Sequence, residues 1–395
     1  MTLLSLGMIL TLGFLTGLLF EKIKLPKIVG MIVIGILIGP SFLNVIDDSI
    51  LDMSGMLRQI ALVIILTRSG LSLNIDNLKI IGRPAILMCF IPAVFEILAV
   101  MVLAPLLLGV SVIEALLIGS VIAAVSPAVI IPRMLKLKSE GFGEDKHIPE
   151  LIMAGSSADD IFVIVLFYAF LGLAQGTSLN AWSVVQIPIS IILGIGVGVV
   201  VGFLFVKLFQ MIQIQRLTKI LLLLSVSFVL IGLEHLLENY ISFSALIGVL
   251  TIGMVILIKS RTDADEIEHG YKQMWTFFEI ILFVLVGISV DVNYAISAGL
   301  MPVIVLIGAL VFRMFGVYVS LLFTALNFKE KLFSMISYIP KATVQASIGA
   351  IALSLGLPVG SLVLTMAVIS ILITAPLGAM LMDSSYKKLL AQPIK

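Results

Sequence analysis

The chain has 395 residues, of which 61% are hydrophobic and 12% are charged, and its mean hydropathy is +1.24. These values lie outside the range of soluble globular domains, and a formal net charge of +1 gives no sign of a nucleic-acid partner. The sequence therefore predicts a protein that crosses a membrane many times. Its single cysteine, Cys89, excludes a disulfide framework and a cysteine metal cluster.

Apolar segments of the length that a helix needs to cross a bilayer, about 20 residues, recur along the whole chain. In order they are 3–20, 28–45, 54–72, 84–109, 112–134, 148–174, 185–207, 217–236, 241–258, 272–290, 300–326, 332–354 and 358–382. Between segments 84–109 and 112–134, Ser111 and Glu114 form an S-x-x-E capping box, which favours a turn and a new helix. We therefore predict an all-α protein with about 13 transmembrane helices.

Most of the 24 basic residues fall in alternate loops, as the positive-inside rule requires of cytoplasmic loops. These loops follow the first, third, fifth, seventh, ninth and eleventh segments, and the C-terminus lies on the same side. The opposite loops carry Arg58 alone. The N-terminus is expected outside and the C-terminus in the cytoplasm, in a multi-pass protein of the plasma membrane.

Several ionisable residues lie inside the apolar segments, where a charge is costly unless it is paired or faces water. The acids are Glu96, Asp159, Asp160 and Glu279, and the bases well inside a segment are Arg313 and Lys341. The acids outnumber the bases, so at least one acid is expected to have no basic partner. The adjacent aspartates are the strongest sign of a function, because helix packing alone does not require two neighbouring carboxylates.

The chain divides into two halves of similar layout if segment 185–207 is a linker. Six segments then lie on each side, and the single linker inverts the second half relative to the first. The fourth segment of each half carries one buried charge, Glu96 in the first and Arg313 in the second. The fifth segment of each half carries proline in mid-span. We therefore predict two inverted six-helix repeats.

Proline inside a membrane helix frees a carbonyl, which lipid does not satisfy and a polar cavity does. The residues at these interruptions are Ser126, Pro127, Pro132 and Pro340. Interrupted helices at matching places in inverted repeats indicate the ion site of a transporter. Their freed carbonyls, with Ser156 and Ser157 one turn before the aspartates, would give hard oxygen ligands for Na⁺ or Li⁺.

Neighbouring residues on a helix point about 100° apart, so one aspartate can face a wet cavity while the other faces Lys341. A low dielectric favours the protonated carboxyl, so a proton and a cation compete for one group. Such competition is exchange and needs no further chemistry. The residues therefore indicate no enzyme and no cofactor, only transported Na⁺ or Li⁺ and H⁺.

Three stretches carry a resemblance to a known family. They are RSGLSLN, AAVSPAVIIPRMLKLKSEGFGEDKHIPELIMAGSSADDIFVIVLF and IPKATVQASIGA, in this order between about residues 60 and 355. They resemble the cation/proton antiporter superfamily, most closely its NHA branch of sodium/proton antiporters, with NhaA and NapA as more distant relatives. The resemblance implies a core domain with two crossed broken helices that moves, in an elevator mechanism, against a dimerisation domain.

The resemblance also implies a role for each matching residue. Asp160 matches the carboxylate that binds cation and proton in turn, and Asp159 matches its neighbour, which pairs with the lysine at the position of Lys341. Glu96 and Arg313 match a buried pair that ties the two repeats together.

Transferred to this chain, the resemblance implies a core domain over 84–174 and 300–382, a dimerisation or scaffold domain over 1–72 and 217–290, and a linker helix over 185–207. The expected assembly is a homodimer in the membrane, with lipids as partners and neither nucleic acid nor a nucleotide-binding domain.

Other functions fit part of this pattern. A K⁺/H⁺ exchanger or K⁺ efflux system of the same superfamily would use the same acids, because oxygen ligands alone do not fix the size of the cation. A cation channel would share the acids and the broken helices, and transport kinetics separates it from an antiporter. An intramembrane aspartyl protease needs two aspartates from separate helices, whereas these are adjacent.

Overall fold

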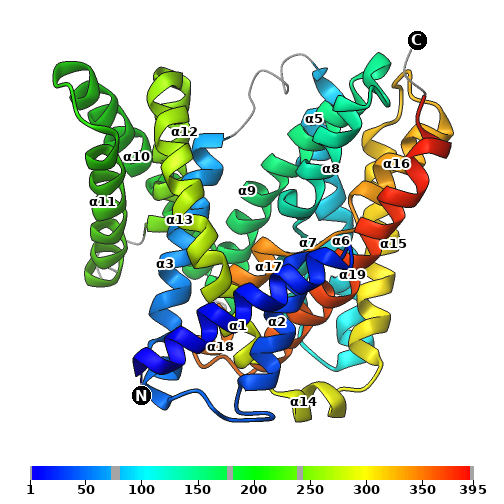
Figure 1. Cartoon of the computed structure of the whole chain (residues 1–395), viewed down its shortest axis with the longest axis horizontal. Coiled ribbons are helices and arrows are strands. Elements are labelled where there is room, and N and C mark those ends of the chain that lie inside the picture. The colour runs from blue at the N-terminus through cyan, green and yellow to red at the C-terminus, as the bar shows by residue number, and fades with distance from the viewer. Residues whose placement is uncertain (1, 73–80, 176–180, 238–242, 392–395) are drawn as a thin grey trace. The chain divides into compact units, whose positions relative to one another are not determined.

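A computed structural model describes residues 2–72, 81–175, 181–237 and 243–391, although the side chains of 157–158 and 181–188 lie outside this description. Within these ranges the chain is helical and has no strand (Figure 1). The all-α prediction is therefore confirmed for the described residues, and the chain is a multi-pass membrane protein.

Ten helices of the described residues are long and apolar enough to cross a membrane. Seven are single helices: α1 (Thr2–Lys22), α3 (Asp48–Ser72), α9 (Ile148–Gln175), α10 (Ala181–Met211), α11 (Arg216–Leu237), α13 (Arg261–Ile288) and α19 (Gly360–Leu389). An eighth is α15 (Met301–Ser320). The remaining two are each made of two helices, α5 (Arg83–Met88) with α6 (Ile91–Leu108), and α7 (Val112–Ala123) with α8 (Pro127–Ser139).

Three of the predicted spans coincide with shorter apolar helices of 10–17 residues. They are α2 (Lys27–Ile38), α12 (Ala245–Lys259) and the pair α17 (Thr343–Ile348) and α18 (Ile351–Ser354). Each predicted segment thus contains an apolar helix. The count of thirteen spanning helices and the inverted repeats stay predictions.

Helix α7 begins where the capping box predicts it. The Ser111 hydroxyl accepts a hydrogen bond from Glu114 N at 3.3 Å, and Ser111 N donates to Glu114 Oε2 at 2.8 Å. Just before it, Gly109 ends α6 with a φ of +69°, a conformation that glycine adopts without strain. The turn between the fourth and fifth predicted segments is therefore confirmed.

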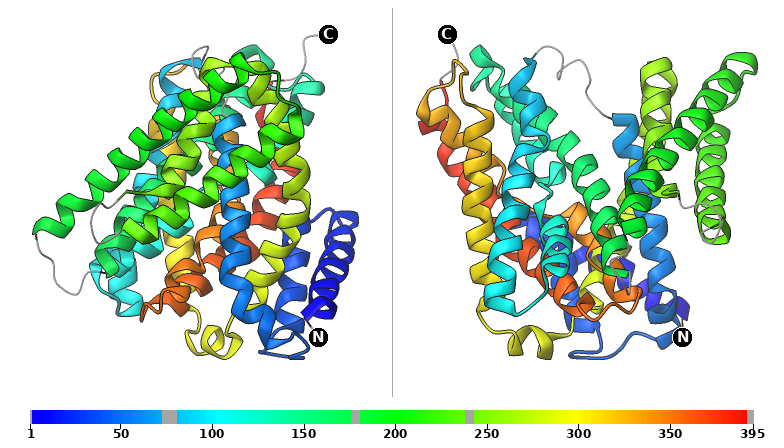
Figure 2. Two further views of the ribbon diagram at one scale, coloured as in Figure 1. Left: turned by 90° about the vertical axis from the view of Figure 1, so that its left-hand side faces the viewer. Right: turned by 180° about the vertical axis from the view of Figure 1, so that it is seen from behind.

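The chain folds into two compact units. Unit 1 consists of Met1–Gly55, Asn74–Ala174 and Ile280–Lys395, and unit 2 of Met56–Leu73 and Gln175–Glu279. In unit 1, α6 packs along α15 and against α7, and α1 packs against α2 (Figure 1). In unit 2, α12 lies against α10 and α11 (Figure 2).

These units are defined by how closely their helices pack, and they coincide only in part with the predicted domains. Both predicted core ranges, 84–174 and 300–382, fall in unit 1. Residues 1–55 and 280–290, expected in the scaffold, fall in unit 1 as well. Packing does not test which part moves, so the division into core and scaffold stays a prediction.

Helices α2 and α13 approach closely in unit 1 through paired glycines. A Cβ on Gly35 would collide with the carbonyl oxygen of Val284, and its next neighbour is Gly287 Cα at 3.0 Å. Backbone cannot move aside as a flexible side chain does, so Gly35→Ala is expected to destabilise the protein by about 1–3 kcal/mol. A lower thermal unfolding midpoint in detergent would show this.

The matched control is Gly7→Ala on α1, where an added Cβ has nothing within 4 Å. Because alanine favours helix over glycine by up to about 1 kcal/mol, this variant should be neutral or slightly stabilising. Equal unfolding midpoints for both variants would contradict the close approach of α2 and α13.

Candidate functional site

Two helix breaks in unit 1 form the framework of the site. The first lies between α7 and α8, where Ser126 precedes α8 and Pro127 is its first residue. Proline suits this position because the first N–H groups of a helix have no helical acceptor. Pro132 lies inside α8, which continues through it, and this corrects the prediction that places Pro132 at the break. A proline removes one helical hydrogen bond, and α8 tolerates that loss.

The second break lies between α16 (Phe328–Ser337) and α17, with Pro340 and Lys341 inside it. Ser126 N donates a hydrogen bond to Pro340 O at 2.9 Å, so the two breaks touch through their backbones. Residues more than 200 positions apart in sequence thus meet inside one unit.

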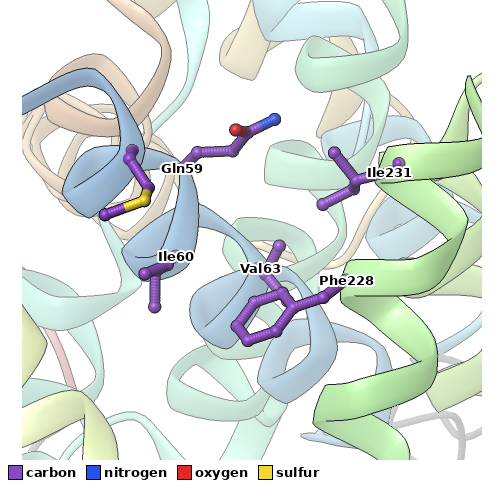
Figure 3. A pocket seen from close by; sticks show the side chains of 7 residues that line it. Gln59, Ile60, Val63, Phe228 and Ile231 are labelled. Atoms are coloured by element: carbon purple, nitrogen blue, oxygen red, sulfur yellow. The ribbon is translucent and has the colours of Figure 1, made fainter. Parts of the chain in front are cut away.

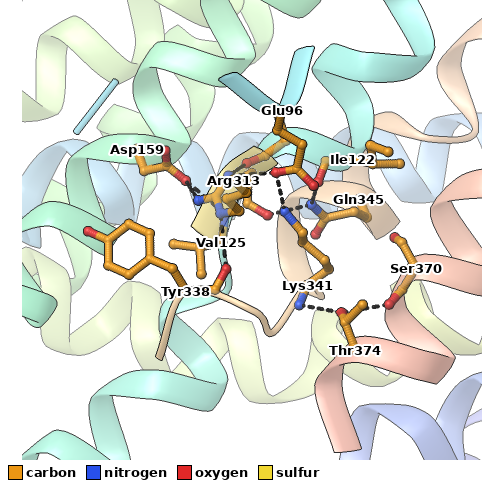
Figure 4. A network of polar contacts seen from close by, with 12 residues as sticks. Glu96, Ile122, Val125, Asp159, Arg313, Tyr338, Lys341, Gln345, Ser370 and Thr374 are labelled. Carbon is orange, nitrogen blue, oxygen red and sulfur yellow. Dashed lines mark hydrogen bonds and ion pairs between the residues drawn. The ribbon is translucent and has the colours of Figure 1, made fainter. Parts of the chain in front are cut away.

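Arg313 on α15 holds two buried carboxylates beside these breaks. Its guanidinium forms ion pairs with Glu96 Oε2 at 2.8 Å and with Asp159 Oδ2 at 2.9 Å. It also donates from Nε to Tyr338 O at 3.0 Å in the second break, and from Nη1 to Ala123 O in the first. In Figure 4, Arg313 lies between Asp159 and Glu96. One side chain therefore links both breaks to both acids.

Lys341 pairs with Glu96 and not with Asp159. Its Nζ lies 2.6 Å from Glu96 Oε2, and its backbone N donates to Thr374 Oγ1 at 2.9 Å. The Asp159–Lys341 pair that the family resemblance implies is therefore not formed, whereas the predicted Glu96–Arg313 pair is present. Asp159 pairs with Arg313 instead of Lys341, because the planar guanidinium of Arg313 presents enough donors to bind Asp159 and Glu96 at once.

Asp160 differs from its neighbour. Asp159 is fully buried and also accepts a hydrogen bond from Val125 N at 2.8 Å, which fixes it against the first break. Asp160 is 6% exposed and makes no ion pair with the residues that the structure describes. Its Oδ1 atom is buried without a hydrogen-bond partner among them.

Four more buried oxygens in this region have no hydrogen-bond partner among the described residues: Asp159 Oδ1, Ser126 Oγ, Glu96 Oε1 and Gln345 Oε1. Folded proteins rarely leave such atoms unpaired, and an ion is one explanation for them. Ser156 is fully buried and donates its hydroxyl proton to Met153 O at 3.2 Å, which leaves its oxygen lone pairs available. The side chain of Ser157 lies outside the described residues.

The network has more acidic than basic groups. Glu96, Asp159 and Asp160 face two bases, Arg313 and Lys341, and all five are buried. With every group ionised, one negative charge is uncompensated. Since a buried uncompensated charge is costly, this network favours the uptake of one proton or one monovalent cation.

Sequence reasoning missed two residues that organise the site, Gln345 and Thr374. Gln345 Nε2 donates to Ala124 O at 2.7 Å, and Thr374 Oγ1 receives the Lys341 amide and donates to Ser370 O at 2.6 Å. Gln345 has a sequence signal, because it is a polar residue four positions after Lys341 in an apolar segment. A threonine in a membrane helix commonly bonds its own helix, so Thr374 has no such signal.

Unit 2 contains a separate pocket of about 440 Å³. It lies between α3 and α11 and is lined by Met56, Gln59, Ile60, Val63, Phe228, Ile231 and Gly232 (Figure 3). No charged side chain lines it, so it does not offer the ligands that a desolvated cation needs.

Comparison with known proteins identifies relatives of the whole chain. The sequence matches the family model described as "Sodium/hydrogen exchanger, transmembrane" over residues 8–383. It is 34% identical to sodium/hydrogen exchanger 9B2 of Xenopus tropicalis over 407 residues, which covers 95% of this chain and 72% of that protein. It is 33% identical to sodium/hydrogen exchanger 9B2 of Homo sapiens, covering 90% of this chain and 68% of the relative.

A solved structure has the same fold. The sodium proton antiporter MjNhaP1 from Methanocaldococcus jannaschii, determined at pH 8, superposes with a TM-score of 0.84 over 98% of each chain. The two sequences are 22% identical, so this likeness shows the fold alone.

Proposed function

The chain belongs to the sodium/hydrogen exchanger family, and we propose that it exchanges Na⁺ or Li⁺ for H⁺ across the membrane, with both ions competing for Asp160. Exchangers move ions and make no covalent bonds, so the chain is a transporter and not an enzyme. The exchange uses no cofactor, because the transported ions are the only reactants.

The observation that carries the proposal is the unequal pairing of the two adjacent aspartates. Asp159 is neutralised by Arg313 and held by Val125 N, whereas Asp160 has no basic partner among the described residues. A buried carboxylate without a fixed cation gains most from a mobile one. Asp159 Oδ1 and Ser126 Oγ are further hard oxygens that suit Na⁺ or Li⁺.

Exchange follows from the charge of the network. When Asp160 is protonated, the negative and positive charges of the network are equal in number. The same balance is reached when a monovalent cation replaces the proton. With neither ion bound, one negative charge is left in a low dielectric, which disfavours movement of the empty site. The protein thus changes its access with an ion or a proton bound, which is the coupling that antiport requires.

The finer features of transport belong to the same proposal. A core made of 84–174 and 300–382 carries the site and moves in an elevator mechanism against a scaffold, 1–72 and 217–290, that forms a homodimer. The two helix breaks are the interrupted helices of inverted repeats. The protein lies in the plasma membrane with its N-terminus outside and its C-terminus in the cytoplasm.

The experiment is reconstitution of the purified protein in liposomes with an imposed pH gradient, and a record of internal pH as Na⁺, Li⁺ or K⁺ is added. Proton movement on addition of Na⁺ or Li⁺ supports the proposal and ranks the ions. A response to K⁺ alone indicates a K⁺/H⁺ exchanger of the same family. No response to any of the three, from folded protein at several pH values, contradicts cation/proton exchange.

The charge balance predicts electroneutral exchange of one cation for one proton. Electrogenic exchange builds a potential that slows it, so a shunt of valinomycin with equal K⁺ on both sides would speed it up. We expect the initial rate of Na⁺-driven proton movement to be unchanged by the shunt. Protein-free liposomes with the same shunt give the background.

Stimulation by the shunt would contradict the charge count and show that a second group changes its protonation during the cycle. Lys341 is then the candidate, because it is fully buried and its ammonium group has one ion-pair partner among the described residues, Glu96 at 2.6 Å. In that case Lys341→Ala should lose the stimulation.

A further inference from the structure

Gln345 is an uncharged polar residue within the network of charges. It lies on α17, four residues after Lys341, and its side chain is fully buried. Its Nε2 donates to Ala124 O at 2.7 Å and reaches Ile122 O at 3.4 Å (Figure 4). A carbonyl oxygen accepts hydrogen bonds and cannot donate them, so the NH₂ end of the Gln345 amide is the end that faces these two carbonyls of the first break.

These two carbonyls belong to the end of α7, where a helix leaves its last C=O groups without helical donors. Between them, Ala123 O accepts from Arg313. Three consecutive carbonyls of the first break are thus held by side chains from α15 and α17. Each of these three carbonyls therefore already accepts one hydrogen bond, and their use as ligands for the cation stays a prediction.

Five oxygens at the site have no hydrogen-bond partner among the described residues, and four of them are carboxylate or hydroxyl oxygens. These four are Glu96 Oε1, the Oδ1 atoms of Asp159 and Asp160, and the hydroxyl of Ser126, whereas the fifth, Gln345 Oε1, is an amide carbonyl. A few ligands with strong charge suit a small cation, whereas additional carbonyl dipoles suit a larger one such as K⁺. The number of carbonyls withheld from the site therefore affects which cation it prefers.

We propose that Gln345 is a positioning residue that sets the size selectivity of the site, by holding the carbonyls of Ile122 and Ala124 away from the transported cation. This inference rests on the proposed exchange at Asp160. Gln345 acts through the backbone of the first break and does not itself bind the ion.

The test is Gln345→Met, a substitution of similar volume that removes both N–H donors and adds no charge. Exchange is measured in liposomes as proton movement against the concentration of Na⁺ and of K⁺. The ratio of the KM for K⁺ to the KM for Na⁺ is expected to fall by about tenfold, as for the loss of one or two buried hydrogen bonds, while the maximal rate is kept.

A second variant covers the case in which Gln345→Met does not fold. Gln345→Asn keeps an amide that is one methylene too short for Ala124 O, and it should shift the ratio in the same direction by less. The matched control is Ser347→Ala on the same helix, whose hydroxyl bonds Thr343 O within α17. This control should keep the ratio of the natural protein.

The outcomes separate the two proposals. If the natural protein and Ser347→Ala both fail to exchange, the proposed function fails. If both exchange and the Gln345 variants fold with an unchanged KM ratio, selectivity does not depend on Gln345. Weaker binding of both cations to an equal degree would mark Gln345 Oε1 as a ligand, and it would also overturn the positioning role.

Discussion

Asp160→Asn is expected to reduce cation-driven proton movement to the level of protein-free liposomes, while the protein still folds. The amide has the shape of the carboxyl but neither takes up a proton nor balances a cation. Asp160 makes no ion pair with the described residues, so the substitution leaves the contacts of Arg313 and Lys341 in place. Internal pH in liposomes gives the rate, and thermal unfolding in detergent gives the stability.

The same variant should unfold at an equal or higher temperature. Removing a buried charge that lacks a partner is expected to stabilise the protein by about 1 kcal/mol or more. A mutation that removes activity and raises stability cannot be explained by misfolding. Normal exchange by Asp160→Asn would remove Asp160 from the centre of the mechanism.

Asp383→Asn is the matched control, because it makes the same chemical change outside the network. Asp383 is half exposed and pairs with Arg133 at 3.2 Å. Exposed pairs contribute about 0–1 kcal/mol, so stability and exchange should both stay close to those of the natural protein. Loss of exchange in this control would show that the assay responds to any lost carboxylate.

The architecture could be predicted because a bilayer imposes simple rules on sequence. Each predicted span contains an apolar helix, and the Ser111 capping box correctly separates α6 from α7. The sequence places the breaks at Ser126, Pro127 and Pro340, and the structure has helix interruptions at these positions. Pro132 shows the limit of that signal, since proline also occurs inside a continuous helix.

The list of buried charges could be predicted, but their pairing could not. Sequence shows that an acid is in an apolar segment, and it does not show which of two bases reaches it. Arg313 lies on α15 and Lys341 lies in the second break. Which acid each side chain can contact depends on the path of the backbone through that break. Arg313 takes both Glu96 and Asp159, and Lys341 is left with Glu96. Such a choice is decided by three-dimensional packing.

Arg313→Ala is expected to lower stability by roughly 3–5 kcal/mol, the cost of breaking a buried ion pair from one side. Glu96 retains Lys341, but Asp159 loses its only ion-pair partner among the described residues. The carbonyls of Ala123 and Tyr338 also lose a donor, one in each break. A fall in the thermal unfolding midpoint, measured by size-exclusion chromatography after heating, would show this loss.

Arg313→Lys separates charge from geometry. It keeps one positive charge, but an ammonium group has no planar fork and cannot span two carboxylates and two carbonyls in the same way. Its stability should therefore lie between those of Arg313→Ala and the natural protein. Arg133→Ala is the surface control, with an expected loss of about 0–1 kcal/mol. If Arg313→Ala and Arg133→Ala unfold at the same temperature, Arg313 does not hold the two breaks together, because a buried link between four partners must cost more to remove than an exposed pair.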